Sequence, residues 1–437
     1  MADLTPELIP RLRERNLPGL DLGDNFIYPA YDGHSILNLP ATICRLLSVP
    51  DFGAVSLETG SLESGALDPA YTAPLGDAFR RVILIVMDAL SLHRLQRWMA
   101  DGSLPVWTRL AQAGLLAPLT SITPSTTSAA LTSLWTGRSA AEHGIVGYEM
   151  WLKEYGIVAN MIAHSPIAFK GDAGSLARAG FNPQTFLPFP TLGMHLASHG
   201  VQAFAFQHYS ILHSGLSEMY FKDVKTQAFI SAADLWINLR QLLENSPAVR
   251  QYIWVYWSEV DTFSHRYGPD DERTAAEFVN FSAAFERLFL QHLTPAARQD
   301  TLLILTADHG QITTRQDPHY ELRNHIGLGR RLHIFPTGEN RLMYLFVRPG
   351  QTEAVREYLQ RTWPNQFNCL DPAYAVECGL FGPGTPHPLL FDRLGDYVVV
   401  ARSDAYLWWS IKENNLIGRH GGLHPDEMLV PFLAVSL

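Results

Sequence analysis

RVILIVMD, residues 81–88, is the stretch that decides the fold. After Arg81 it is a continuous run of apolar residues, which is typical of a strand buried on both faces. The strand ends at Asp88, and SLHRLQRWMADG soon after it has helical spacing of its apolar residues and a glycine near its end. This is a strand-loop-helix unit, the element from which parallel α/β sheets are built.

Further apolar runs repeat this pattern, with amphipathic helical stretches between several of them. They are LLAPLTSIT at 115–123, which is followed by the helical segment TSAALTSLWTG closing on Gly137, FAFQHY at 204–209, YIWVYW at 252–257, LLILTA at 302–307, LMYLFV at 342–347, YVVVA at 397–401 and VPFLAVSL at 430–437. The alternation predicts an α/β fold with a doubly wound, mostly parallel central sheet flanked by helices. Sites in such sheets lie beyond the carboxyl ends of the strands.

Length and composition predict one catalytic domain over residues 1–437. Hydrophobic residues make up 47% of the chain and charged residues 17%, which describes a well-buried globular protein. Two stretches, roughly 148–200 and 312–395, fit the alternation of strands and helices poorly. We interpret both as cap or lid insertions over the site.

The formal charge of −10 argues against a nucleic-acid groove, because such grooves need clustered Lys and Arg. A small phosphorylated substrate held by metal ions remains compatible with it. Cys44, Cys369 and Cys378 are too few and too scattered for a disulfide framework or a cysteine-based zinc site. MADLTPELIPRLRERNLPGL lacks the apolar region of a secretory signal, and no run reaches the ~20 apolar residues of a membrane span. We therefore expect a cytoplasmic protein without a membrane segment.

Three predicted core strands each deliver a carboxylate at the carboxyl end. Asp88 follows VILIVM, Asp261 follows WVYWSEV, and Asp308 follows LLILTA. One Asp in such a place is as often a helix N-cap. Three converging carboxylates are different, because they repel one another unless cations separate them. The set predicts a metal site.

Histidines accompany two of these carboxylates. Asp261 and His265 are four residues apart, on one face of a helical turn, and the pair Asp308–His309 sits at a strand end where neighbouring residues can reach different partners. Both patterns suit zinc-like metals. A further ligand is expected in RHGGLHPDEMLVP, whose two glycines allow close backbone approach. We favour His420 there, with His424 as the competing ligand.

A nucleophile is expected at a helix N-terminus, where N–H groups and the helix dipole stabilise a developing oxyanion. ITPSTTSAALTSLWTG offers the four hydroxyls of residues 125–128. Alone, they would be interpreted as an N-cap cluster. A hydroxyl becomes a nucleophile near neutral pH only if a base or a metal lowers its pKa, so the predicted metal ligands give the cluster its meaning.

Five segments in this order resemble the alkaline phosphatase superfamily, and specifically its type I phosphodiesterase/nucleotide pyrophosphatase branch. They are the strand ending at Asp88, PSTTSAALTSLWTGRSAAEHGI, EVDTFSHRYGP, TADHG and RHGG with the following EM. The resemblance implies an alkaline phosphatase-like fold and an enzyme that hydrolyses phosphate esters. In that family the nucleophilic Thr lies three residues after a Pro and nine before the Thr of a Thr-Gly pair. Pro124 and Thr136 therefore place it at Thr127.

The resemblance also implies two divalent metal ions. One would be held by Asp88, Thr127, Asp308 and His309, and the other by Asp261, His265 and His420. Both would be zinc, with manganese as the alternative. The backbone N–H of Ser128 is expected to contact the substrate. His143, in EHGI, matches a family position that is not a metal ligand, so we expect a structural role for it.

One position departs from the family pattern. Nucleotide pyrophosphatases carry an Asn shortly after the HGI segment to hold a phosphoryl oxygen, whereas HGIVGYEMW has Tyr148 at that place. Tyr148 could donate a hydrogen bond to the same oxygen or simply line the cap. Diester specificity is therefore open. A phosphomonoesterase is the alternative, as is a phosphatase domain of the PglZ type, which HGGLHPDEMLVP also resembles.

The sequence thus predicts a metal-dependent hydrolase that works through a phospho-threonine intermediate. A sulfatase is less favoured, because that branch has a Cys or Ser in a C/S-x-P-x-R segment where this chain reads TSAAL from Thr127. Phosphonate hydrolysis and phosphosugar mutase activity use similar ligands and stay as alternatives. An alternative of a different class is a catalytically idle, metal-stabilised interaction module. We disfavour it because every expected ligand type is present.

Overall fold

A central sheet of eight strands contains most of the predicted strands. The computed structural model describes residues 2–53, 65–76, 78–168, 172–246 and 248–437. In order across the sheet, the strands are β1 (Ala2–Asp3), β3 (Leu115–Thr120), β17 (Leu429–Ser436), β10 (Thr301–Thr306), β2 (Arg81–Met87), β9 (Gln251–Trp257), β7 (Gln202–His208) and β8 (Val224–Phe229). Neighbours are parallel, except where β17 pairs antiparallel with β3 and β10. The predicted mostly parallel sheet is confirmed.

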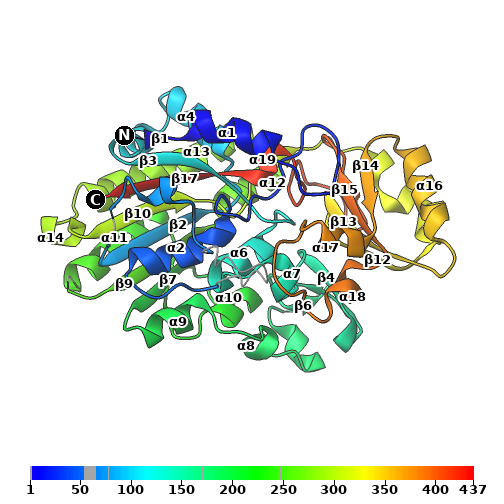
Figure 1. Cartoon of the computed structure of the whole chain (residues 1–437), viewed down its shortest axis with the longest axis horizontal. Helices are drawn as coiled ribbons and strands as arrows, with labels where there is room; N and C mark the ends of the chain where they lie inside the picture. The colour runs from blue at the N-terminus through cyan, green and yellow to red at the C-terminus, as the bar shows by residue number, and fades with distance from the viewer. Residues whose placement is uncertain (1, 54–64, 77, 169–171, 247) are drawn as a thin grey trace.

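The middle of this sheet is buried throughout, because helices cover both of its faces (Figure 1). Every residue of β2, β9 and β10 is buried, so these strands read as continuous apolar runs without alternation. One face carries α1 (Thr5–Glu14), α4 (Leu92–Ala100), α5 (Pro105–Ala113), α12 (Glu259–Tyr267) and α13 (Glu272–Ala284), and the other α2 (Leu39–Leu46), α6 (Thr127–Thr136), α9 (Leu192–Ser198) and α10 (Gly215–Tyr220). Among the described residues, no helix is both long enough and apolar enough to cross a lipid bilayer.

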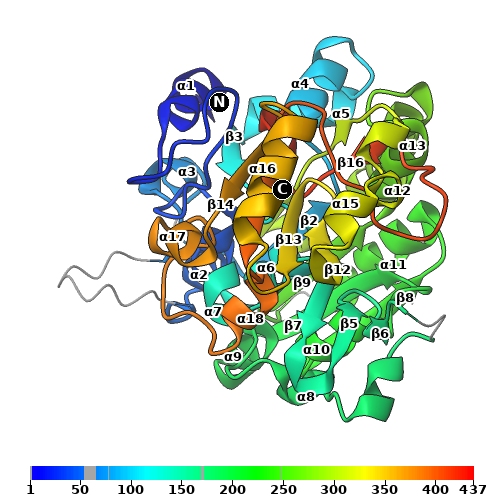
Figure 2. The same ribbon diagram turned by 90° about the vertical axis from the view of Figure 1, so that its right-hand side faces the viewer.

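A second sheet of seven antiparallel strands lies beyond the carboxyl ends of the parallel strands, at the right of Figure 1. Its strands, in order, are β14 (Phe367–Leu370), β15 (Tyr397–Ala401), β13 (Leu342–Val347), β12 (Leu332–Glu339), β4 (Glu149–Leu152), β5 (Ile157–Asn160) and β6 (Ser165–Pro166). Figure 2 shows it face on, with α16 (Thr352–Thr362) lying across it. The runs LMYLFV and YVVVA are therefore β13 and β15 of this second sheet, and not members of the central one, because an apolar run reports burial and not the sheet to which it belongs.

Both predicted insertions contribute strands to this second sheet. The stretch 148–200 supplies β4, β5 and β6, the stretch 312–395 supplies β12, β13 and β14, and β15 follows beyond residue 395. The two contributions meet where β12 pairs with β4. Their backbones come so close there that a Cβ on Gly147 would lie 2.5 Å from Gly338 Cα, so only glycine fits. The role of these stretches as a lid stays a prediction.

Candidate active site

Asp88 and Asp308 lie side by side at the carboxyl ends of β2 and β10, and both are buried. Asp308 Oδ1 accepts the N–H groups of Ala89 and His309 at 3.2 and 2.9 Å. Asp88 Oδ2 accepts the hydroxyl of Tyr256. The other two oxygens, Asp88 Oδ1 and Asp308 Oδ2, have no hydrogen-bond partner among the described residues. His309 Nε2 lies 3.6 Å from each of them.

The buried surroundings of Asp88 and Asp308 disfavour the negatively charged form of both carboxyl groups. Burial, and after it the charges of Asp308 and Asp261, raises the pKa of Asp88 well above its ordinary value. Burial also raises the pKa of Asp308. Buried carboxylate oxygens without donors fit a divalent cation, which supplies the missing positive charge and restores the ionised form. The chemistry of the donors therefore fits the predicted metal.

Asp261, His265 and His420 form a second group of donor atoms. His265 Nε2 and His420 Nε2 lie 3.4 and 3.9 Å from Asp261 Oδ1. Each histidine turns its other ring nitrogen to a backbone carbonyl, His265 to Gly418 at 2.9 Å and His420 to Ser125 at 3.1 Å. An Nδ1–H donated to a carbonyl leaves the Nε2 lone pair free, which is the arrangement of metal-binding histidines.

The two groups form one continuous cluster. Ligand atoms of Asp261, His265 and His420 lie within 4.8 Å of one another, and so do those of Asp88, Asp261 and His309. The ring of His309 stacks on that of His420, with centroids 4.0 Å apart. Asp261 thus belongs to both groups of donor atoms, whereas the family resemblance assigned it to only one of the two ions. All six predicted Asp and His ligands meet in this cluster.

Thr127 is the first residue of α6, and its Oγ1 lies 3.2 Å from His309 Nε2. The three neighbouring hydroxyls point elsewhere, because each donates to an acceptor outside the cluster: Ser125 to Gly422 O, Thr126 to Glu339 Oε1 and Ser128 to Gly147 O. The backbone N–H of Ser128 has no acceptor among the described residues. Of the four hydroxyls, that of Thr127 is the one beside the cluster.

Tyr148 directly precedes β4 of the second sheet, and 37% of its surface is exposed. Its hydroxyl accepts the Asn160 side-chain N–H at 2.6 Å, and its backbone N–H donates to Glu339 at 3.2 Å. Burial raises the pKa of Tyr148 to about 12, so the hydroxyl keeps its proton. That proton stays available to an acceptor.

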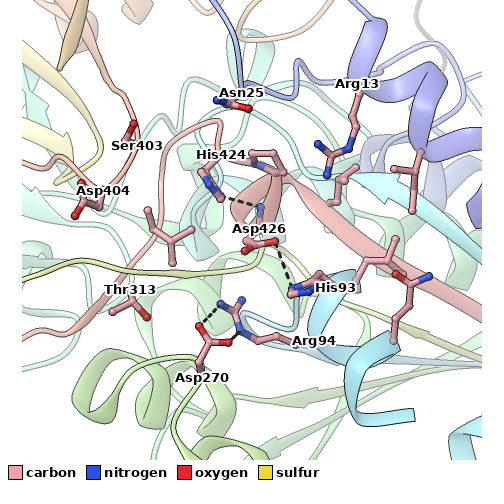
Figure 3. Close-up of a pocket in the computed structure, with 16 residues that line it drawn as sticks. Arg13, Asn25, His93, Arg94, Asp270, Thr313, Ser403, Asp404, His424 and Asp426 are labelled. Carbon is pink, nitrogen blue, oxygen red and sulfur yellow. Dashed lines mark hydrogen bonds and ion pairs between the residues drawn. The ribbon is translucent and has the colours of Figure 1, made fainter. Parts of the chain in front are cut away.

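His424 lies apart from the cluster. It is the N-cap of α19 (Pro425–Met428), and its Nδ1 accepts the N–H of Asp426 at 3.1 Å. It lines a separate cavity of about 660 Å³ (Figure 3), which contains no other predicted site residue. Two ion pairs lie in its wall, since Arg94 Nε lies 3.3 Å from Asp270 Oδ1 and His93 Nδ1 lies 3.8 Å from Asp426 Oδ1.

His143 also lies outside the cluster. It is buried, with Nδ1 accepting the N–H of Ile145 at 3.0 Å and Nε2 lying 3.2 Å from Ser133 Oγ. Burial lowers the pKa of His143 to about 3, so the ring stays neutral. A structural role remains our prediction for it.

Sequence reasoning missed three residues that contact the cluster or its surroundings. Tyr256 donates to Asp88, Gln311 donates to Asp261, and Glu339 accepts from Thr126. Tyr256 could have been identified from the sequence, because it places a hydroxyl group near the carboxyl end of the apolar run YIWVYW. Glu339 carried no signal, because it reaches the site from the second sheet. Burial raises the pKa of Glu339 to about 8.

A buried ion pair ties the loop of His420 to the second sheet. Arg341 Nε and Nη2 donate to the two Glu427 carboxylate oxygens at 2.8 and 3.0 Å. Glu427 in turn accepts the N–H groups of Gly422 and His424 at 2.9 and 3.1 Å. Both charged side chains are fully buried. The bidentate geometry fixes the loop that follows His420.

Solved structures share this fold at low sequence identity. Murine ectonucleotide pyrophosphatase / phosphodiesterase 5 matches with a TM-score of 0.60 and 17% identity, over 81% of this chain and 87% of that one. The human protein of the same name matches at 0.58 and 14%, over 81% and 87%. Phosphonoacetate hydrolase from Sinorhizobium meliloti 1021 matches at 0.57 and 18%, over 80% and 89%. No curated protein matches the sequence.

The family model of type I phosphodiesterase / nucleotide pyrophosphatase matches residues 82–423, which is well over half of the 437 residues. The matched segment begins on β2 and ends just after His420, so it includes Thr127 and every ligand atom of the cluster. The chain therefore belongs to the type I phosphodiesterase / nucleotide pyrophosphatase family of the alkaline phosphatase superfamily, and it is a phosphoric ester hydrolase.

Proposed function

We propose that the protein hydrolyses phosphodiesters by a two-step mechanism in which Thr127 is the nucleophile. The observation that carries the proposal is the place of Thr127 Oγ1, 3.2 Å from His309 Nε2 at the N-terminus of α6. In the proposed arrangement Asp88, Thr127, Asp308 and His309 hold one divalent ion, and Asp261, His265 and His420 hold the other. Zinc is the metal we expect, with manganese as the alternative.

When bound, two such ions lower the pKa of a coordinated hydroxyl and offset the charge of a phosphoryl group. The protein's own groups then orient the reaction. The free N–H of Ser128 and the positive end of α6 receive one phosphoryl oxygen. We expect the Tyr148 hydroxyl, which retains its proton, to donate to a second oxygen in the way the family asparagine does.

The chemical step is an in-line displacement at phosphorus. Thr127 Oγ1 forms the new P–O bond while the bond to the leaving alcohol breaks, which leaves a phospho-threonine. Water then attacks phosphorus from the opposite side, releases the phosphate monoester and restores the Thr127 hydroxyl. The net reaction adds one water to one diester.

Charge favours a diester over a monoester. Three carboxylates and one alkoxide balance the charge of two divalent ions, so the proposed site has no surplus positive charge for a dianion. The Arg341 guanidinium, beside the loop of His420, is already bound to Glu427 at 2.8 Å. A diester carries one negative charge and a monoester close to two near neutral pH.

The structural neighbours support a small phosphoryl ligand. An inactive variant of the murine protein was solved in complex with AMP, and the bacterial hydrolase in complexes with phosphonoformate and phosphonoacetate. We propose a ligand of this size and charge class for the present chain.

The test compares the monoester, a diester and the sulfate ester of one nitrophenol, with purified protein and added zinc or manganese. We expect the diester to react fastest, and a chelator to abolish turnover until metal is restored. Thr127→Ala should lower kcat by about a thousandfold or more and retain two ions per chain, since a covalent nucleophile is lost. Thr136→Ala, which removes the same hydroxyl from the other end of α6, should stay near wild type.

Each alternative has its own outcome in this experiment. Faster reaction of the monoester would favour a phosphomonoesterase or a phosphatase of the PglZ type. Absence of turnover with fewer than two ions per chain would favour the idle interaction module. Retained activity in Thr127→Ala would reject the nucleophile.

A further inference from the structure

The N-terminus of α6 has an unusual cap. Thr126 is the N-cap residue, with extended backbone (φ −140°, ψ 145°), yet its side chain makes no cap hydrogen bond. A threonine at this position ordinarily accepts an N–H group of the first helical turn. The Thr126 hydroxyl instead donates to Glu339 Oε1 over 2.5 Å. The Thr126 side chain is therefore turned toward Glu339, and its oxygen accepts no N–H group of the first turn of α6.

Glu339 is held in place from two further directions. Its Oε1 also accepts the backbone N–H of Tyr148 at 3.2 Å. On another side Gly421 lies so close that a Cβ there would meet Glu339 Cβ at 2.3 Å. Because Gly421 follows His420 directly, the Glu339 side chain lies between the turn that bears Thr127 and the loop that bears His420.

The first turn of α6 consequently keeps unused donors. The first intrahelical bond runs from Ala130 N–H to Thr126 O at 2.9 Å. Among the described residues, the N–H groups of Ser128 and Ala129 have no acceptor. Uncapped N–H groups at a helix N-terminus, together with the dipole, favour an anion.

We propose that Glu339 is a positioning residue: by accepting the Thr126 hydroxyl it prevents that side chain from capping α6, and so leaves the N–H groups of Ser128 and Ala129 to a phosphoryl oxygen of the substrate. This inference rests on the proposed function, since it assigns those donors to the same site. Glu339 acts through Thr126 and does not react itself.

The proposal differs from a merely structural role in one consequence. Without Glu339, the Thr126 hydroxyl is free to rotate and accept the N–H of Ser128 or Ala129, where it competes with substrate. The damage then comes from the hydroxyl. Removing that hydroxyl as well should restore the site, whereas damage from lost packing would persist or grow.

The experiment measures kcat/KM for the nitrophenyl diester and the inhibition constant of inorganic phosphate. In Glu339→Ala we expect kcat/KM to fall about fivefold and the inhibition constant to rise by a similar factor, the equivalent of one N-cap hydrogen bond. The double variant Glu339→Ala with Thr126→Val should return to within about twofold of wild type. Glu339→Gln should resemble wild type, because its amide oxygen still accepts both bonds.

Two further variants keep the test decisive. Thr126→Val alone should stay within about twofold of wild type. Glu339→Asp retains the carboxyl group but shortens the reach, so it should behave like Glu339→Ala and be restored by Thr126→Val. It replaces Glu339→Ala if thermal melting shows that the alanine variant does not fold.

The outcomes separate this inference from the function on which it rests. A wild-type protein that hydrolyses none of the esters would refute the proposed function. A wild type that turns over, with a double variant as poor as Glu339→Ala, would refute the role of Glu339. Equal losses in Glu339→Gln and Glu339→Ala would also refute it, because they would show that an oxygen acceptor at this position is not enough.

Discussion

At the scale of residues, the cluster is organised by the groups that orient its ligands. Tyr256 donates to Asp88 and Gln311 donates to Asp261, while carbonyl groups fix the rings of His265 and His420. Such partners set which oxygen or nitrogen faces the metal, and losing one typically costs 10- to 100-fold in metal affinity or activity.

Tyr256→Phe tests this organisation. The change removes one hydroxyl and leaves Asp88 Oδ2 without its donor, so we expect zinc affinity or kcat/KM to fall roughly 10- to 100-fold. Zinc titration against a competing chelator and ester kinetics would measure it. Tyr252→Phe is a matched control on the same strand, because the buried Tyr252 hydroxyl has no partner among the described residues. Equal effects of the two changes would contradict the role of Tyr256.

Sequence reasoning could name residues that stand in local patterns, and it missed those that do not. The six Asp and His residues were predicted because they follow buried strands or carry short family motifs. His420 and His424 were harder to separate, since both stand in one glycine-rich segment. Glu339 could not be predicted, because its contact with Thr126 depends on how two distant segments pack and leaves no periodic trace.

At the scale of elements, the turn between β12 and β13 joins the two halves of the candidate site. Glu339 ends β12 and reaches the turn before α6, and Arg341 follows closely and binds Glu427 beside the loop of His420. The sequence predicted the two insertions as regions that break the alternation. It could not show that they share one sheet, because the pairing of β4 with β12 joins segments far apart in the chain.

Arg341→Met tests the buried ion pair. The change leaves the Glu427 carboxylate buried without its partner, which typically costs 3–5 kcal/mol of stability. Urea unfolding would measure the loss. Adding Glu427→Gln removes the stranded charge and should recover part of it, so a double variant less stable than Arg341→Met alone would show that the pair does more than balance charge.

At the scale of the whole molecule, buried and half-buried histidines couple stability to pH. Burial lowers the pKa of His143 to about 3, of His164 to about 4 and of His387 to about 4. The unfolded chain binds these protons near the ordinary value of 6.5, and the native protein binds them only in stronger acid. Native stability should therefore fall as pH decreases below 6.5, and these groups should contribute nothing above it.

His164→Leu isolates one of these contributions. Neither ring nitrogen of His164 has a partner among the described residues, so the change removes no hydrogen bond. Between pH 6.5 and pH 5, wild type should lose about 2 kcal/mol through this group that the variant keeps. The left-handed backbone at residue 164 (φ 49°) strains a leucine side chain equally at every pH. It therefore changes the unfolding free energy of the variant by a constant amount and leaves its pH dependence unaffected. Parallel curves of unfolding free energy against pH would contradict the assignment.

The position of β17 has a consequence for biosynthesis. This strand of eight residues, Leu429–Ser436, occupies the gap between β3 and β10 in the middle of the central sheet. Until it emerges from the ribosome, those two strands present unpaired edges, which are templates for aggregation. A chain that ends before Leu429 would thus lack the strand that pairs with both β3 and β10. A nascent chain would need protection from aggregation until these residues have been synthesised.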